Sequence, residues 1–439
     1  MKNFLKYLLT FCILIFSFNV ILLLVSTFSS ELMKENVRES SEILKKEGNR
    51  YALSKFFNIV NNNYTDAIIV NAAYSIDNEN PVYSYMTARR NYKKGITKKE
   101  LPDIQGELNS LKMNSIDEFT EKYDPVGELY NFLNGEIIAS INYARYWHGN
   151  LVLFRPLLLI FNIMEIRTLL FGIFLILFIY FIYLLAKKFD KRIAFIFAIS
   201  LICNGYFSAS YSLESSPIFL VMILSSIFLL KKIDKIENFS LYIFAVACIA
   251  NFVDFLTVPL ITLGIPMLIW FIDMQNKGKS LKECIIFIIK NSIIWLLGYA
   301  LTWITKWIIY DLMFDGEIIN ICLQQITHRT QRTSELVTKS FFETMKRVFD
   351  LNLVYIFCLA FFEVFFKIKL NSKKELIESI PYFIIALMPI VWYVVLANHT
   401  IIHIHFTYRH MIIFLCAFYL GINKSLNIKP KYAMFGKKK

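Results

Sequence analysis

The feature that most constrains this chain is a series of long apolar runs that recur over most of its length. Residues 8 to 28 read LLTFCILIFSFNVILLLVSTF, and further runs follow after residue 150. A helix needs about 20 apolar residues to cross the hydrocarbon core of a bilayer, which is about 30 Å thick. Lipid offers the backbone no hydrogen-bond partner, so spanning segments are expected to be helical. With 56% hydrophobic residues and 41 Phe, the sequence predicts an all-α polytopic membrane protein.

These runs predict about ten membrane-spanning helices. The first run follows Lys2 and Lys6 and lacks a small-residue cleavage site, which favours an uncleaved anchor over a signal peptide. Residues 151–163 are too short to cross and are interrupted by Arg155 and Pro156, which indicates a re-entrant or interfacial segment. The predicted spans are residues 8–28, 167–186, 193–210, 217–230, 239–256, 258–273, 291–310, 352–367, 379–397 and 411–423.

The predicted domains follow from the break in this pattern. After the anchor (1–28), residues 29–150 are too polar to cross and are long enough for a large, mainly helical extracytoplasmic loop domain. No convincing alternation of apolar and polar residues indicates strands there. The multi-helix region covers 151–423, with outer loops at 312–351 and 398–410, and a basic cytoplasmic tail covers 424–439. Within the loop domain, helices are predicted at 31–46, 52–61, 65–76, 82–91, 115–122 and 126–146.

The distribution of lysine and arginine predicts the orientation. The net charge is +13, and the basic residues gather in alternate short loops, as in Lys187, Lys188, Lys191 and Arg192. Cytoplasmic loops of membrane proteins carry this excess, so both termini are predicted to be cytoplasmic. The bias toward Ile, Lys, Asn and Phe is typical of an AT-rich bacterial genome, so the membrane is expected to be a bacterial inner membrane. Nucleic acid is not an expected partner. This orientation places all six histidines and residues 29–150 on the outer side. The seven scattered cysteines form no CxxC pair and predict neither a disulfide framework nor a zinc site.

Residues 398–410, NHTIIHIHFTYRH, hold four of the six histidines between two apolar runs. Arginine presents a planar fork of donors that suits phosphate, and histidine adds a further donor. The alternative is that these residues anchor the chain at the membrane surface. His399 and His403 share a helix face but His405 does not, and no acidic residue completes a ligand set, so no metal site is predicted. A divalent metal therefore has no supporting motif. The phosphate-binding candidates here and elsewhere on the outer side are Arg155, His328, Arg329, Arg332, His399, His403 and Arg409.

Three further groups of residues are candidates for function. Asp66, in NNNYTDAIIVN, is the best candidate for a general base, with a helix N-cap as the alternative and Asp77 as a weaker choice. The segment YARYWH adds Arg145 and His148 among aromatic residues that suit either a sugar face or an interfacial belt. Ionisable residues inside spans are costly, so Asp254 and Lys306 are expected either to pair or to line a cavity. The sequence holds no phosphate-binding glycine loop, dinucleotide fingerprint or kinase motif.

This combination resembles the GT-C superfamily of membrane glycosyltransferases. The resemblance rests on an anchor followed by a large outer loop, on YTDAIIVN at 64–71, and on YARYWHGNLVLFRP and NHTIIHIHFTYRH. It implies transfer of a sugar from a polyprenyl-phosphate-linked donor to an extracytoplasmic glycan, lipid or protein. It also implies that Asp66 is the catalytic acidic residue, although Ala67 stands where a second acidic residue is usual. The donor phosphate would meet Arg145, His148, Arg155, His328, Arg329, Arg332, His399, His403 and Arg409, and the cavity would include Asp254, Lys306 and Tyr408.

Three other functions fit parts of the pattern. A flippase or transporter for lipid-linked oligosaccharides would use polar residues inside the membrane, which only Asp254 and Lys306 favour. A polysaccharide polymerase or ligase would use the same lipid-linked donors and the same outer arginines and histidines. A sensor would use residues 29–150 to bind its ligand, but the chain shows no cytoplasmic signalling domain.

Overall fold

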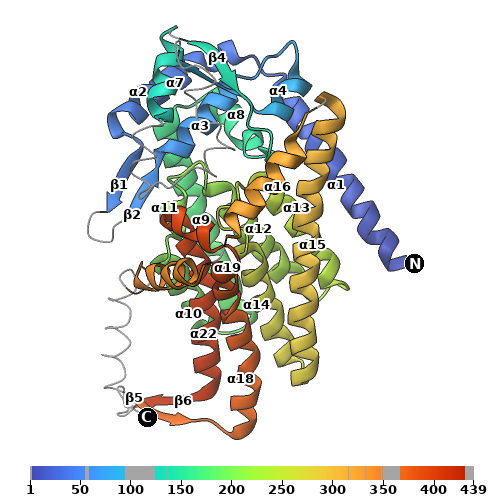
Figure 1. The fold of residues 1–439 in the computed structure, drawn as a ribbon. Helices are drawn as coiled ribbons and strands as arrows, with labels where there is room; N and C mark the ends of the chain where they lie inside the picture. Colours follow the sequence, from blue (N-terminus) through green and yellow to red (C-terminus); the bar gives the residue numbers. More distant parts are fainter. Residues whose placement is uncertain are drawn as a thin grey trace.

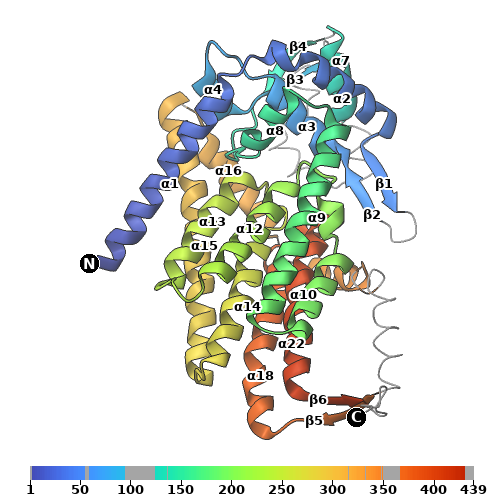
Figure 2. The same ribbon diagram turned by 180° about the vertical axis from the view of Figure 1, so that it is seen from behind.

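The computed structural model describes residues 2–54, 59–93, 124–135, 137–314, 316–331, 333–347, 349 and 366–430. The chain is mostly helical, which confirms this part of the prediction, and it forms a helix bundle with a smaller domain at one end (Figures 1 and 2). We call this the domain end. The opposite end carries lysine-rich connections such as residues 231–237 and 277–282, and we call it the basic end.

Four helical segments among the described residues are long and apolar enough to cross a membrane. They are α1 (Lys2–Ser26), α9 (Ile163–Lys188), α15 (Leu281–Phe314), and α18 (Lys373–Ala386) continued by α19 (Met388–Val395). Their outward side chains are strongly exposed, for example Phe16 at 71% and Ile176 at 69%. Such apolar surface is costly in water, and these helices indicate a membrane protein.

The other predicted spans correspond to shorter helices, except that residues 352–367 lie almost wholly outside the described residues. The helix 334–347 precedes that part of the chain. The shorter helices are α10 (Lys191–Cys203), α12 (Ser216–Lys232), α13 (Phe239–Val253), α14 (Ile261–Asn276) and α22 (Met411–Ser425). Side chains cap the start of two helices. Asp190 accepts from two backbone N–H groups of α10, and Asn162 forms a capping box with Glu165 at the start of α9.

Short strands are the main departure from the all-α prediction. Residues 52–61 were predicted as a helix, which is wrong, because β1 (Arg50–Ser54) and β2 (Ile59–Asn62) form an antiparallel pair there. The predicted helix 126–146 divides into α7 (Pro125–Leu133) and β4 (Ile137–Ile141), and β4 pairs with β3 (Arg90–Lys93). The third pair joins β5 (Phe366–Leu370) to β6 (Leu426–Pro430) at the basic end.

Local backbone conformation explains two of these breaks. Gly135, at φ +76°, lies between α7 and β4, and Ala88, at φ +43°, ends α4 (Pro81–Thr87) before β3. Positive φ interrupts a helix, so neither predicted helix continues through its break. The remaining helices of the domain agree with the prediction, with η1 (Ser30–Met33), α2 (Lys34–Glu47) and α3 (Asn63–Tyr74). The predicted helix 115–122 lies outside the described residues.

Several short helices meet where the domain joins the bundle (Figure 1). The predicted re-entrant segment forms α8 (Leu151–Leu158) at the domain end, in contact with α1 and α3. The others are α11 (Tyr206–Ala209), α16 (Ile318–Arg329), α20 (Ala397–Ile402), α21 (Ile404–Thr407) and η2 (Tyr408–His410). This junction brings together most of the residues that the sequence singled out.

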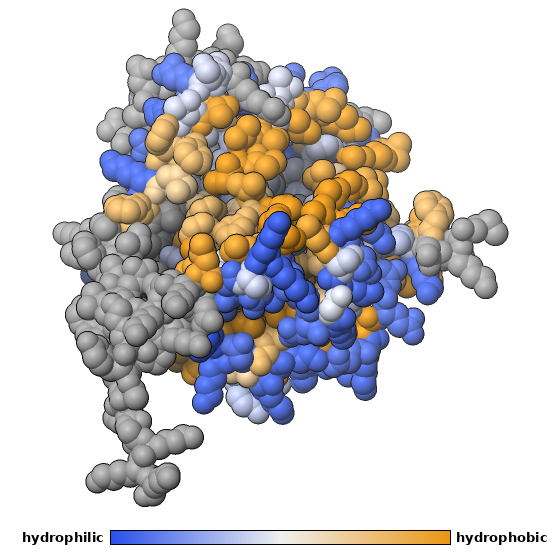
Figure 3. All heavy atoms as spheres, turned by 90° about the horizontal axis from the view of Figure 1, so that it is seen from below, coloured by the Kyte–Doolittle hydropathy of each residue, from blue (hydrophilic) through white to orange (hydrophobic). Residues whose placement is uncertain are grey.

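The basic end has a different surface. Seen from that end, hydrophilic residues gather over one part of the face and hydrophobic residues over another (Figure 3). Lys188 and Lys277 form ion pairs with Asp234, and Lys277 also pairs with Asp273. The two ends therefore differ in chemistry, with paired lysines at one and buried polar groups at the other.

Candidate functional site at the junction of the domain and the helix bundle

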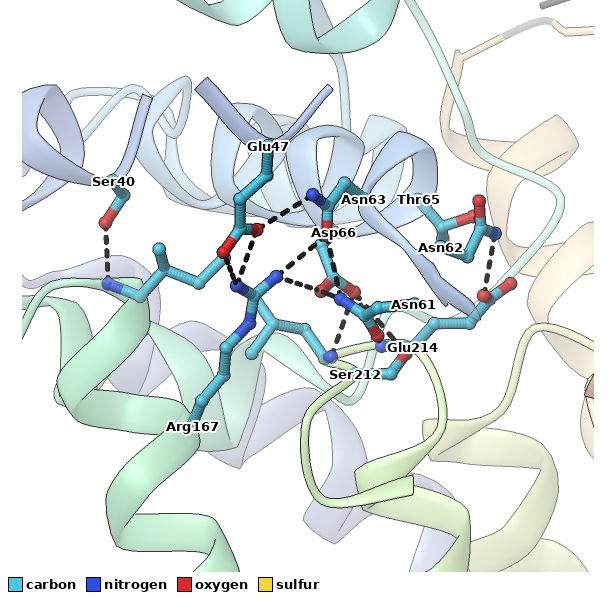
Figure 4. A network of polar contacts seen from close by, with 12 residues as sticks. Ser40, Glu47, Asn61, Asn62, Asn63, Thr65, Asp66, Arg167, Ser212 and Glu214 are labelled. Atoms are coloured by element: carbon cyan, nitrogen blue, oxygen red, sulfur yellow. Dashed lines mark hydrogen bonds and ion pairs between the residues drawn. The ribbon is translucent and has the colours of Figure 1, made fainter. Parts of the chain in front are cut away.

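Asp66 lies at the centre of a buried polar network that joins the domain to the bundle (Figure 4). It is in the first turn of α3 and does not cap this helix, because the N-cap residue is Asn62. Its Oδ2 atom accepts from Arg167 and from Asn61, each at 3.2 Å. Its Oδ1 atom accepts from the backbone N–H of Leu213 at 2.9 Å and of Glu214 at 3.3 Å. Burial raises the pKa of Asp66, and Arg167 and Asn61 oppose this rise.

The guanidinium of Arg167 is fully buried and holds three segments together. It donates to Glu47 at the end of α2 at 2.9 Å, to Asn63 at the start of α3 at 2.9 Å, and to Asp66. A buried pair of this kind is costly to break, because the remaining charge then lacks its partner. Asp66 and Arg167 therefore fix the position of the domain on α9.

Glu214 is a second buried carboxyl, and it lies beside Asp66 in the loop that precedes α12. Only 5% of the residue is exposed. One carboxyl oxygen accepts from the side-chain amide of Asn62 at 3.0 Å. Burial raises the pKa of Glu214 to about 8, with a further rise from the charge of Asp66 and a fall from that of Arg409. Glu214 therefore exchanges its proton in the range where an acid–base group operates.

Arg409 lies on the bundle side of this carboxyl. Its Nη1 atom donates to the hydroxyl of Ser215 at 2.7 Å, and its Nη2 atom donates to Ser208 at 3.3 Å. The residue is 3% exposed, its Nε has no partner, and no carboxylate lies at ion-pair distance among the described residues. The hydroxyl of Tyr408 is also buried without a partner there. A Cβ at Gly205 would come within 2.8 Å of that hydroxyl, so only glycine leaves room at this position.

The surroundings of Arg409 are strongly cationic. Burial lowers the pKa of His405 to about 3, and the charges of Arg50, Arg409 and Arg347 lower it further. The guanidinium carbon of Arg347 lies 4.6 Å from the ring centre of Tyr408. The charges of three arginines thus act on one neutral histidine, and the charge of Arg409 also acts on the carboxyl of Glu214. We call Glu214, His405, Tyr408 and Arg409 the Arg409 group.

Arg329 and His399 form a second contact, on the other side of the histidine-rich segment. Nδ1 of His399 accepts from Nη1 of Arg329 at 2.6 Å, and Nε2 of His399 donates to the carbonyl of Leu256 at 3.0 Å. These two bonds require the neutral tautomer that is protonated on Nε2. Arg329 also donates to the hydroxyl of Tyr146 at 3.3 Å. Leu256 has φ +64°, a strained conformation for leucine, of a kind found often at functional sites.

The segment 143–149 packs against this contact. Arg145 lies over the rings of Tyr143 and Tyr146, at 4.8 and 5.3 Å from their centres. Nε2 of His148 lies 2.7 Å from the carbonyl of Tyr143. Burial lowers the pKa of His148 to about 3, so its ring is neutral. Its φ of +57° makes it the second strained residue at this place.

The remaining histidines connect the two regions. His403 lies 4.7 Å from His399 and 6.1 Å from His405, measured between ring centres. His328 lies next to Asn398, whose amide nitrogen is 3.3 Å from its ring, and lines a hollow of about 260 Å³ on α16. His399, His403 and His405 therefore form a row that runs from Arg329 toward Arg409.

Three of the predicted site residues have their polar atoms engaged by other groups of the protein. Arg155 is fully buried and donates to the carbonyls of Val25, Ala73 and Phe28, so its donors are occupied by protein oxygens. Asp254 accepts from Thr257 and from the hydroxyl of Tyr299. Nζ of Lys306 donates to the carbonyl of Met86 at 2.7 Å. Asp254 and Lys306 are not an ion pair among the described residues, and Arg332 lies outside them.

Two residues of the site were not identified from the sequence. Glu214 is the only acidic residue between Asp190 and Asp234, and this isolation between apolar runs was an available signal. Arg167 was taken as the first residue of a span, and nothing in the local sequence indicates its partner. Asp77, the weaker candidate, accepts from the N–H of Glu79 in an exposed turn. No cluster of three His, Cys, Asp or Glu side chains suited to a metal occurs in the described part of the chain.

Comparison of the chain with protein-family models, with curated proteins and with solved structures gave no match.

Proposed function

We propose that this chain is a membrane glycosyltransferase that moves a sugar from a polyprenyl-phosphate-linked donor to an acceptor outside the cytoplasm. The main support is the Arg409 group, in which a buried guanidinium without a carboxylate partner lies near the carboxyl of Glu214. A buried arginine of this kind suits the phosphate of a donor, and a carboxyl with a raised pKa suits proton transfer. Both lie at the end of the helices that would enter the membrane.

In this proposal the chemistry is a direct displacement at the anomeric carbon of the donor sugar. The acceptor hydroxyl oxygen forms the new bond to this carbon while the bond from the carbon to the phosphate oxygen breaks. The hydroxyl proton passes to the carboxylate of Glu214, and the lipid phosphate leaves with the electron pair. Arg409 stabilises the negative charge that develops on the phosphate, and such a preorganised donor contributes about 100-fold or more to the rate.

Glu214 suits the base role better than Asp66. Asp66 is fully buried and accepts from Arg167, Asn61 and two backbone N–H groups, so its lone pairs are already engaged. Because it binds the N–H of Glu214, we assign Asp66 as the residue that positions the loop of Glu214. The resemblance to GT-C enzymes instead implies Asp66 as the catalytic base, and substitution of the two residues separates these assignments.

The proposed orientation has about ten spans, with both termini in the cytoplasm and the domain outside. It rests on the lysines of the basic end, which would face the cytoplasm. The junction then lies at the outer surface of an inner membrane, within reach of lipid-linked donors. Lipid tails would enter sideways between the helices.

The test is sugar transfer by the purified full-length protein from a mixture of polyprenyl-phosphate sugars. We expect transfer by the wild type, and its loss in Arg409→Ala and Glu214→Gln. The matched controls are Arg38→Ala and Glu79→Gln, which change exposed residues of the domain and should keep full activity. Asp66→Asn should lower stability more than turnover per folded molecule. Unchanged turnover in Arg409→Ala would exclude the role of Arg409 in phosphate binding. Loss of transfer in Asp66→Asn alone would assign the catalytic base to Asp66.

The alternatives predict other results in the same assay. If the wild type binds the lipid and moves it across a vesicle bilayer without sugar transfer, the chain is a flippase. If it transfers whole oligosaccharides but no single sugar, it is a polymerase or ligase.

A further inference from the structure

We propose that the chain binds a second anion, separate from the donor phosphate, at Arg145 and Arg329, and that this anion is a phosphate or carboxylate of the acceptor. This inference deepens the proposed function, and the assignment of the anion to the acceptor rests on that function. The presence of an anion site rests only on the contacts of Arg145, Gln325 and Arg329.

Arg145 carries donors that the described residues leave unused. The residue is 9% exposed, and its Nε and Nη1 atoms have no partner in the described part of the chain. Among the described residues, the guanidinium donates one hydrogen bond, from Nη2 to the hydroxyl of Tyr143 at 3.0 Å. An unsatisfied donor in the interior is costly, and one on a charged group is more costly still. A bound anion would satisfy the two remaining donors at once.

Arg329 and Gln325 reach the same place from α16. Cys322, Gln325 and Arg329 are spaced by three and four residues, so they share one face of this helix. Both arginines contact Tyr146, because the guanidinium carbon of Arg145 lies 5.3 Å from its ring centre and Nη2 of Arg329 donates to its hydroxyl at 3.3 Å. The side-chain amide of Gln325 is buried and has no partner for its nitrogen or its oxygen among the described residues.

The acidic groups around this place are engaged elsewhere. Asp254 accepts from Thr257 and Tyr299. Asp311 accepts from the first N–H groups of α16, at 2.9 and 3.2 Å. Neither forms an ion pair with Arg145 or Arg329 within the described ranges. Two positive charges therefore lie near each other without a neutralising carboxylate, which is the arrangement that favours an anionic ligand.

The segment that carries Arg145 is firmly held, so the site is formed before a ligand arrives. The indole N–H of Trp307 donates to the carbonyl of Arg145 at 3.0 Å, and that of Trp147 donates to the carbonyl of Thr302 at 2.8 Å. A Cβ at Gly149 would lie 2.5 Å from the carbonyl oxygen of Phe252, which shows how closely the two backbones approach.

This site is separate from the Arg409 group. The row of His399, His403 and His405 lies between them. The ring centres of His399 and His403 are 4.7 Å apart, and those of His403 and His405 are 6.1 Å apart. One phosphate cannot bridge that row, so the two cationic regions would hold two different anions. If the Arg409 group binds the donor, the anion at Arg145 and Arg329 belongs to the other substrate.

The first experiment is equilibrium dialysis of the full-length protein, in nanodiscs of phosphatidylcholine, against radiolabelled inorganic phosphate at low ionic strength. We expect Arg145→Gln and Arg329→Gln each to bind one phosphate fewer per chain than the wild type. Arg409→Gln should also bind one fewer, and Arg145→Gln combined with Arg409→Gln should bind two fewer. Arg38→Gln, which removes an exposed arginine, should bind as the wild type.

Two further variants protect the result against misfolding. Arg329 is half-buried, so its substitution disturbs the core less than that of Arg145. Arg145→Lys keeps the charge but loses the planar fork, and should weaken this phosphate site several-fold without abolishing it. Wild-type binding by folded Arg145→Gln and Arg329→Gln would overturn the second site.

Competition identifies the source of the anion. Displacement of phosphate by nanodiscs that contain phosphatidic acid indicates a lipid headgroup, and displacement only by glycerol 3-phosphate indicates a soluble acceptor. In the transfer assay, Arg145→Gln should raise the KM for the acceptor at least tenfold and leave that for the donor unchanged. If no transfer occurs at all, the proposed function fails, but the phosphate count still decides whether the second site is present.

Discussion

Replacement of Glu214 by glutamine tests the central electrostatic feature of the junction without any knowledge of the substrate. Burial raises the pKa of Glu214 to about 8, from an ordinary value of 4.5. A raised pKa means that the folded state holds the proton more tightly than the unfolded state. The resulting stability is complete below pH 4.5 and is lost as the pH rises through 8. Between pH 5 and 8 this loss amounts to about 3 kcal/mol in the free energy of unfolding.

Glutamine has nearly the same shape but no ionisable group, so Glu214→Gln should remove this loss. The measurement is thermal unfolding of both proteins in detergent at pH 5, 6, 7 and 8. Relative to the variant, the wild type should lose roughly 5 °C in Tm across this range. Histidine titration affects both proteins equally and cancels in the difference. Glu79→Gln, an exposed control, should follow the wild type. Parallel Tm curves for the wild type and Glu214→Gln would refute the burial of Glu214 as a neutral acid.

Three further predictions follow from the same contacts. Asp66→Asn should lower the free energy of unfolding by about 3 kcal/mol, because Arg167 then loses one of its two buried carboxylate partners, and Glu79→Gln at an exposed position is the control for thermal unfolding. Sugar transfer should rise about fivefold between pH 7 and 8, because deprotonation of Glu214 produces the base, and a flat pH–rate profile there would exclude it. Acidification from pH 7 to 5 should lower the free energy of unfolding by about 2 kcal/mol for each histidine that the fold keeps neutral. A Tm that is constant over this range would contradict the burial of these histidines. These histidines are His148, His405 and His410.

The fold was predictable from the sequence where a single segment carries its own signal. The run at 8–28 and the run at 167–186 each correspond to a helix of sufficient length and hydropathy, because composition alone decides whether a segment suits lipid. The hairpin of β1 and β2 was missed because each strand has only four or five residues and its pairing lies outside its own sequence. Short strands depend on cross-strand partners, which local propensity does not record.

The candidate site was predictable only in its ingredients. The sequence singled out both the histidine-rich segment and YARYWH. In the structure, Arg329 connects them, because it donates to His399 of the first and to Tyr146 of the second. Arg155 was selected for the same reason, yet its donors meet backbone carbonyls. Residue type indicates what a side chain can bind, but not which partner the fold places within hydrogen-bond distance of it.

By itself, then, the sequence determined a mostly helical chain with apolar helices of membrane length, one polar domain after the first helix, and a concentration of lysine apart from histidine. These are properties of single segments, since hydrophobic burial and charge depend on local composition. Only the tertiary structure decided that Asp66 pairs with Arg167, 101 residues away, and that Arg409 reaches Ser215 across 194 residues. Such contacts form because helix packing brings side chains within about 3 Å of one another, and a difference of one turn would separate them.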